Sequence, residues 1–162
     1  MKKSILVLGC MLCMVTGTFA KTDHKNVNVS NEVSQSFSQK YPQCSVKKWH
    51  MVDGNDVAIF TWEGAKKFAY FSPDGTWIKT EKKISEFHGL PETIRSAWNK
   101  SPYASWKIAT IKDVMTPDGE MYTIRAGYDY GPDGSEPTDD MAVVRLYYKP
   151  DGTFIKKVDI SD

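Results

Sequence analysis

The sequence predicts an α+β fold built as a tandem duplication, in which a helix followed by four antiparallel strands occurs twice. Three observations support this prediction. Apolar residues recur at helical spacing in two short segments, and each segment ends at a proline. Segments rich in aromatic and β-branched residues follow each predicted helix and are separated by glycine-containing turns. A ten-residue stretch near the middle of the chain also matches a second stretch near its end.

The first 20 residues have the layout of a cleavable secretory signal. Lys2 and Lys3 precede an apolar run. The run extends from Ile5 to Val15 and is followed by small residues as far as Ala20. It is shorter than the roughly 20 apolar residues that span a bilayer. We therefore expect a signal peptide over residues 1–20, cleavage after Ala20, and a periplasmic mature protein without a membrane span.

The mature chain has almost no net charge. Removal of the signal leaves 19 basic against 20 acidic residues. This balance provides no overall attraction to nucleic acid or to anionic lipid, so neither is an expected partner.

Only one cysteine, Cys44, remains in the mature chain, because Cys10 and Cys13 leave with the signal. An internal disulfide is therefore excluded. We favour burial of the Cys44 thiol as a small hydrophobe over intermolecular pairing. Cys10 also loosely resembles a lipoprotein processing site, but cleavage there would leave almost no apolar segment to be recognised.

The remaining length suits a single domain. Residues 21–29 are polar and lack apolar periodicity, which predicts a flexible leader. The domain is expected over residues 30–162, with its two repeats over residues 30–84 and 88–161.

The first repeat is expected to begin with a helix capped by Ser30. Val33, Phe37 and Tyr41 recur at four-residue spacing, and Pro42 ends the helix because proline lacks the amide hydrogen. The turn sequences that follow predict four strands, near residues 45–52, 56–62, 66–72 and 76–83.

The second repeat is expected to follow the same order. Pro91 lies in the first turn of a helix, where proline is tolerated, and Pro102 ends it. Ile94, Ala97 and Trp98 form its apolar stripe. Four more strands are predicted, near residues 105–114, 120–129, 141–149 and 153–160.

The internal match joins residues 70–79 to residues 147–156, and seven of these ten positions are identical. A Pro-Asp-Gly turn explains part of the match, since the same tripeptide also begins at Pro117 and Pro132. The flanking identities and the repeated order of elements favour a true duplication.

Strand alternation then predicts which side chains share a face of the sheet. A bulged turn would set Tyr148 opposite Phe154 and Tyr147 opposite Ile155. The core face is expected to include Ala69, Phe71, Trp77, Ala142, Val144, Leu146, Tyr148, Phe154, Val158 and Ile160. The opposite face is expected to include Phe68, Tyr70, Ile78, Arg125, Val143, Arg145, Tyr147, Ile155 and Lys157.

The face opposite the core is unusual for a solvated sheet, which is normally polar. Tyrosine and arginine with interspersed aliphatic residues are typical of protein interfaces. The candidate partner-binding residues are Phe68, Tyr70, Ile78, Arg125, Arg145 and Tyr147. The alternative is that segments 112–120 and 129–141 fold over this face and bury it.

The sequence contains no recognisable catalytic or cofactor motif. His24, His50 and His88 lack the spacing of metal ligands or of a base with its nucleophile. A nucleophile elbow, a phosphate-binding glycine loop, a dinucleotide fingerprint and paired zinc-binding cysteines are missing. We therefore predict no catalytic residues, no enzyme activity and no cofactor, with a hidden acid–base pair of carboxylates as the third alternative.

One acidic loop, residues 129–140, is a weak calcium candidate. Its carboxylates include Asp133, Asp139 and Asp140, and calcium prefers several oxygen ligands from a flexible loop. The spacing does not fit the helix–loop–helix calcium pattern, and a solvated hairpin loop explains it equally well. A calcium-responsive or small-ligand-binding periplasmic protein is therefore the alternative function.

With these features, the chain resembles the exported PepSY-like family of Gram-negative gut anaerobes, which is structurally similar to the beta-lactamase inhibitory protein. The resemblance rests on the signal, the two helix-plus-four-strand copies, and the hairpins that begin at Tyr70 and Tyr147. It covers about residues 30–160. It implies a single curved eight-stranded sheet with the helices on its convex side and its concave side facing outward.

The resemblance also implies binding of a protein partner, with inhibition of a periplasmic enzyme such as a peptidase. The inhibitory protein contains disulfides, whereas the mature chain retains only Cys44, so beta-lactamase is not the expected target. The leading prediction is a non-catalytic periplasmic protein-binding module whose partner the sequence does not name.

Overall fold

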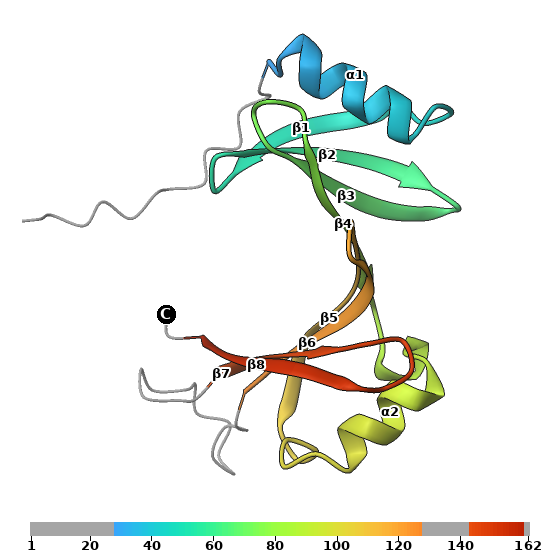
Figure 1. Ribbon diagram of the computed structural model, residues 1–162. Coiled ribbons are helices and arrows are strands. Elements are labelled where there is room, and N and C mark those ends of the chain that lie inside the picture. Colours follow the sequence, from blue (N-terminus) through green and yellow to red (C-terminus); the bar gives the residue numbers. More distant parts are fainter. Residues whose placement is uncertain (1–27, 128–142, 161–162) are drawn as a thin grey trace, which may run out of the picture.

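The computed structural model describes residues 28–127 and 143–160. These residues form one open antiparallel sheet of eight strands, in which each strand pairs with its neighbours in sequence (Figure 1). The strands are β1 (Val46–Val52), β2 (Asn55–Trp62), β3 (Ala65–Phe71), β4 (Trp77–Ile84), β5 (Lys107–Thr116), β6 (Gly119–Gly127), β7 (Val143–Tyr148) and β8 (Phe154–Ile160). Helix α1 (Asn31–Lys40) precedes β1, while the short η1 (Phe87–Gly89) and helix α2 (Glu92–Asn99) connect β4 to β5. The predicted α+β class and single sheet are confirmed.

Helix α1 begins and ends where the sequence predicts, whereas α2 begins after Pro91 and ends at Asn99, before Pro102. The Ser30 hydroxyl accepts a hydrogen bond from the Val33 amide at 3.3 Å, and the Tyr41 amide closes the helix on the Phe37 carbonyl at 2.8 Å. Pro91 occupies the N-cap of α2, and Trp98 lies on its buried face. None of the helices in the described part of the chain is long and apolar enough to cross a membrane. The predicted signal peptide and most of the leader lie outside the described residues.

Both helices cover the same face of the sheet. Residues paired directly across strands share a face. Ala69, under α1, pairs with Thr80, and Thr80 pairs with Met115 of β5. Ile111, four positions before Met115 on β5, pairs with Ile124 under α2. In Figure 1 the sheet curves, and both helices lie on its outer, convex side.

Each helix packs over its own hydrophobic cluster. The α1 cluster consists of Val33, Phe37, Tyr41, Ala58, Phe60, Ala69 and Phe71, with the half-buried Trp77 and Cys44 against it. The α2 cluster consists of Leu90, Ile94, Trp98, Ile111, Ile124, Ala126, Val144, Leu146 and Tyr148. The expected core positions in β3 and β7 are therefore confirmed among the described residues, whereas Ala142 lies outside them.

The last strand corrects the predicted alternation. Tyr148 pairs with Phe154 as expected, but Tyr147 pairs with Lys156, because Ile155 is the extra residue of a bulge. The bulge shifts the alternation by one residue along the rest of β8. Val158 and Ile160 therefore lie on the face without helices, and Lys157 lies on the helix side. Phe154 keeps its expected partner but is 52 % exposed, so it is not part of the core.

The two Pro-Asp-Gly hairpins, β3–β4 and β7–β8, make the same hydrogen bonds. In each, the residue before the proline donates to the residue after the glycine, and the aspartate carboxylate accepts from the amide of that second residue. The matching bonds are Ser72 N to Thr76 O (2.9 Å) and Lys149 N to Thr153 O (2.8 Å), with Thr76 N to Asp74 Oδ1 (3.0 Å) and Thr153 N to Asp151 Oδ1 (2.8 Å). Both glycines have positive φ and lie against the backbone of a helix.

Gly152→Ala is expected to lower the free energy of unfolding by about 3 kcal/mol, measured by urea denaturation. The φ of Gly152 is +87°, and a Cβ there would lie 2.6 Å from the Thr93 carbonyl oxygen. Gly54→Ala is the control, because φ is +75° but no atom lies within 4 Å of the new Cβ. Gly54→Ala should lower the free energy of unfolding by only about 1 kcal/mol, which is the cost of placing an alanine in the left-handed backbone conformation. Equal costs would show that α2 does not pack tightly on this turn.

Candidate functional site

Five of the six candidate partner-binding residues share the face of the sheet opposite α1 and α2, called here the open face. In β3, Tyr70 pairs with Lys79 and Phe68 pairs with Glu81. The other three are brought together by β6 and β7. Arg125 lies opposite Arg145, and Tyr147 lies opposite Thr123. Ile78 is the extra residue of the bulge between β3 and β4 and is 36 % exposed.

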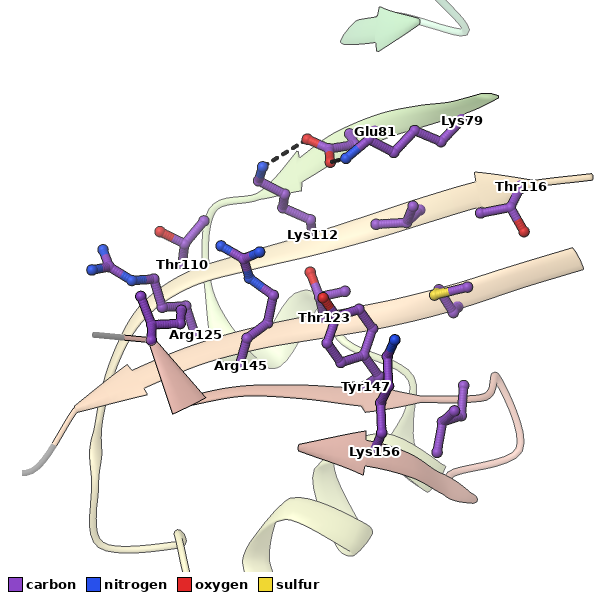
Figure 2. A pocket seen from close by; sticks show the side chains of 14 residues that line it. Lys79, Glu81, Thr110, Lys112, Thr116, Thr123, Arg125, Arg145, Tyr147 and Lys156 are labelled. Atoms are coloured by element: carbon purple, nitrogen blue, oxygen red, sulfur yellow. Dashed lines mark hydrogen bonds and ion pairs between the residues drawn. The ribbon is translucent and has the colours of Figure 1, made fainter. Parts of the chain in front are cut away.

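The open face contains a hollow of about 660 Å³ over β4 to β8 (Figure 2). Arg125, Arg145 and Tyr147 line it, whereas Phe68, Tyr70 and Ile78 do not. The structure therefore divides the predicted set into a group on β3 and a group in the hollow. The other lining residues are Lys79, Glu81, Thr110, Lys112, Val114, Thr116, Met121, Thr123, Ile155, Lys156 and Ile160.

The hollow is strongly basic. Among the described residues, five cationic side chains line it against one carboxylate, that of Glu81, which leaves an excess of four positive charges in this part of the chain. Of the carboxylates on described strand residues, Glu81 is the one in register with the open face; Asp56, Asp113, Glu120 and Asp159 lie in register with the helix side. The near-neutral composition thus hides a separation of charge between the two faces. The near-neutral net charge predicted no overall attraction to polyanions, and it contains no information about such a local cluster of cations.

Glu81 is only 6 % exposed and joins three strands. Its carboxylate accepts from the ammonium groups of Lys79 and Lys112, both at 2.6 Å, and from the Tyr70 hydroxyl at 3.2 Å. Burial alone would raise the pKa of Glu81, but the hydrogen bonds from Lys112 and Lys79 outweigh it and lower the pKa below its ordinary value. Glu81 is therefore ionised at neutral pH and fixes β3, β4 and β5 beside the hollow.

Tyr70 serves this network as a neutral donor. Burial and the nearby negative charge of Glu81 raise the pKa of the Tyr70 hydroxyl well above its ordinary value. The group keeps its proton at any physiological pH and donates it to the carboxylate.

Lysine ammonium groups lie over the aromatic rings of the open face. Lys79 Nζ lies 4.3 Å from the ring centre of Tyr70, and Lys156 Nζ lies 4.8 Å from that of Tyr147. Such cation–π contacts hold the long lysine side chains in place. They also occupy the ring faces that a base or a sugar would use for stacking.

Two cations of the hollow have no carboxylate partner among the described residues. Arg145 is exposed and makes no hydrogen bond or ion pair with the described part of the chain. The side chain of Lys156 contacts the Tyr147 ring but no described carboxylate. Figure 2 shows both side chains on the same side of the strands as Tyr147.

Sequence analysis missed the lysines and the glutamate of the hollow. The signal was present in the period-2 order of β4, where Lys79, Glu81 and Lys83 alternate with Thr80 and Lys82. Interface composition favours aromatic and arginine residues over lysine, so it does not single out the lysines of this face. In β8, Lys157 is expected on this face from alternation, but the bulge at Ile155 places Lys156 there instead.

The sequence offers two alternatives to partner binding, which are burial of the open face under segments 112–120 and 129–141 and a calcium site in the acidic loop. Segment 112–120 forms part of the β5–β6 hairpin and does not cover the open face. Segment 129–141, with the calcium candidates Asp133, Asp139 and Asp140, lies outside the described residues. Within the described ranges, no group of three or more His, Cys, Asp or Glu side chains is placed to hold a metal.

Comparisons with known proteins identify the fold. No family model and no curated protein match the sequence. A DUF2874 family protein from Bacteroides ovatus matches with a TM-score of 0.69 at 26% identity, over 84% of this chain and 91% of that one. A BLIP-like protein from Bacteroides fragilis matches with a TM-score of 0.68 at 19% identity, over 84% of this chain and 89% of that one.

A third similar structure comes from Bacteroides eggerthii and is described as a candidate periplasmic protein. Its TM-score is 0.64 at 16% identity, over 83% of this chain and 91% of that one. The three matches span nearly the whole of each solved chain. The protein therefore has the BLIP-like fold, an open eight-stranded sheet with two helices on one side.

Proposed function

We propose that this protein is a non-catalytic periplasmic module that binds another protein through its open face and inhibits it. The observation that supports this most directly is the hollow, where Arg145 and Lys156 lie beside Tyr147 on the face opposite α1 and α2. Arginine and tyrosine are enriched in the residues that dominate binding energy at interfaces. Export would follow cleavage of residues 1–20 after Ala20.

The chemistry of the hollow supports binding more than catalysis. A general base needs a pKa near the working pH. The lysine contacts lower the pKa of Glu81 instead, so this buried carboxylate is a poor base. The structural similarity to a BLIP-like protein supports inhibition as the outcome of binding, and the candidate periplasmic protein from Bacteroides eggerthii supports the location.

A tandem duplication within a PepSY-like family is part of this proposal. The equivalent glycines Gly75 and Gly152 contact helix backbones at Glu32 and Thr93, so the same turn packs under each helix. The matching hydrogen bonds of the two hairpins support the same origin. On this view the second helix–strand unit diverged to acquire the basic hollow.

Site-specific photocrosslinking in the periplasm tests the proposed function. A photoreactive phenylalanine analogue at Tyr147 is expected to crosslink the chain to one partner protein, since Tyr147 lines the hollow. The same analogue at Asn99, exposed at the end of α2 on the helix side, is the matched control and should give no such product. A partner crosslinked only from Asn99, or no crosslinked protein from Tyr147, would contradict binding through the open face.

A further inference from the structure

We propose that the partner inserts an extended acidic segment into the hollow. Along the edge of this segment that faces the sheet, two successive side chains are carboxylates and the next side chain is apolar. This inference rests on the proposed function and specifies the chemistry of the partner. It starts from the excess of positive charge among the described residues that line the hollow. Arg145 and Lys156 lie there without a carboxylate partner in the described part of the chain, so an anionic ligand would supply the opposite charge.

The register arranges the hollow in three rows across the strands. The first row contains Arg125 and Arg145, and the second contains Lys112, Thr123, Tyr147 and Lys156. The third row contains Glu81, Val114 and Met121, in which Val114 pairs with Glu81 on one side and Met121 on the other. Figure 2 shows the labelled members of the first two rows side by side.

The spacing of these rows fits an extended peptide. Same-face residues of one strand lie about 7 Å apart, and alternate side chains of an extended peptide repeat at the same distance. A segment lying along the strands would place one carboxylate at the arginine row and the next at the lysine row. Its third side chain would then contact Val114 and Met121. The expected motif is acidic–x–acidic–x–apolar, in either chain direction.

Other polyanions fit this surface less well. The cations line a hollow on the face opposite the helices, which is the concave side of the sheet in Figure 1, and a flat membrane cannot follow such a concave surface. Nucleic acids bind open sheets by stacking bases on aromatic rings. Here Lys79 and Lys156 lie over the rings of Tyr70 and Tyr147. A sulfated glycan has no side chain to pack against the row of Val114 and Met121.

Fluorescence anisotropy with a labelled synthetic peptide tests this inference on the exported protein. The probe contains Glu-Thr-Glu-Thr-Leu, and the matched peptide contains Gln in place of both Glu residues. We expect the Glu peptide to bind at least about tenfold more tightly than the Gln peptide, and its affinity to fall with added salt. A sulfated polysaccharide, a single-stranded oligonucleotide and anionic vesicles are the competing probes.

Charge reversals locate the binding. Arg145→Glu and Lys156→Glu should each lower the affinity for the Glu peptide by about tenfold or more. Lys157→Glu changes the net charge equally but lies on the helix side of the same strand, so affinity should change by less than about twofold. An unchanged melting temperature for all three variants shows that each remains folded.

Three outcomes would overturn the acidic-segment proposal. These are equal affinity for the Glu and Gln peptides, an equal loss with Lys157→Glu, and tighter binding of the polysaccharide, oligonucleotide or vesicles than of the Glu peptide. If the peptide fails while Tyr147 still crosslinks to a protein, the proposed function stands and only the acidic chemistry is wrong. If both fail, the open face is not a protein-binding surface.

Discussion

Phe60→Ala is expected to lower the free energy of unfolding by about 3–5 kcal/mol, the usual cost of deleting a fully buried phenylalanine. Phe60 is 0 % exposed and lies at the centre of the α1 cluster. Its ring centre is 5.1 Å from that of Phe37 and 4.6 Å from that of Tyr41, so the cavity would separate β2 from the helix. Urea denaturation followed by tryptophan fluorescence measures the change, since Trp49 and Trp62 lie around this cluster.

Phe154→Ala is the matched control for this prediction. Phe154 also contacts an aromatic ring, that of Tyr148 at 5.7 Å, but its side chain is 52 % exposed. It should cost less than about 1 kcal/mol, because little apolar surface leaves the solvent on folding. A cost near that of Phe60→Ala would mean that β8 packs into the core, as strand alternation alone predicts, and that the exposed position of Phe154 is wrong.

Local chemistry explains why the elements could be predicted from the sequence. Ser30 and Pro42 bound α1 through the cap and the missing amide, which are short-range effects. The Pro-Asp-Gly turns likewise fix the hairpins from a few residues each. The single sheet came from the resemblance, because nothing local specifies that β4 pairs with β5 through Thr80–Ile84 and Ile111–Met115.

The errors in β8 and in the charge analysis have a common physical cause. Both predictions depend on which face of the sheet a side chain occupies. A one-residue shift in the register of a strand exchanges the two faces. The bulge at Ile155 exchanges the faces of Lys157 and Val158, and the sequence did not indicate the size of that shift. The basic hollow gathers lysines from three strands, Lys79 on β4, Lys112 on β5 and Lys156 on β8, so their proximity depends on the complete register.

Glu81→Gln is expected to have opposite effects on folding and on binding. The carboxylate is buried and accepts from two ammonium groups, so the neutral amide leaves Lys79 and Lys112 close together without compensation. We expect a loss of about 1–3 kcal/mol at pH 7, at the lower end because both lysines are about a third exposed. The same change removes the single carboxylate among the described residues that line the hollow and should tighten binding of the acidic peptide.

The pH dependence distinguishes a lost ion pair from simple repacking. The pKa of Glu81 is lowered in the folded protein, so its contribution to stability is fully present above the ordinary carboxyl pKa of about 4.3. It is lost as the pH falls through the folded value, so the stability difference between the wild type and Glu81→Gln should shrink below about pH 4.3. A difference that stayed constant in acid would assign the loss to packing.

Glu120→Gln is the matched control for both measurements. It removes the same charge from an exposed position on the helix side of β6, where Glu120 pairs with Met115. Unfolding energy and peptide affinity should both change little, because long-range attraction between exposed charges is screened by salt. If Glu81→Gln and Glu120→Gln raised the affinity for the peptide equally, the gain in affinity would reflect the change in net charge alone. A gain confined to Glu81→Gln, despite the weaker fold, places the ligand within reach of the buried carboxylate.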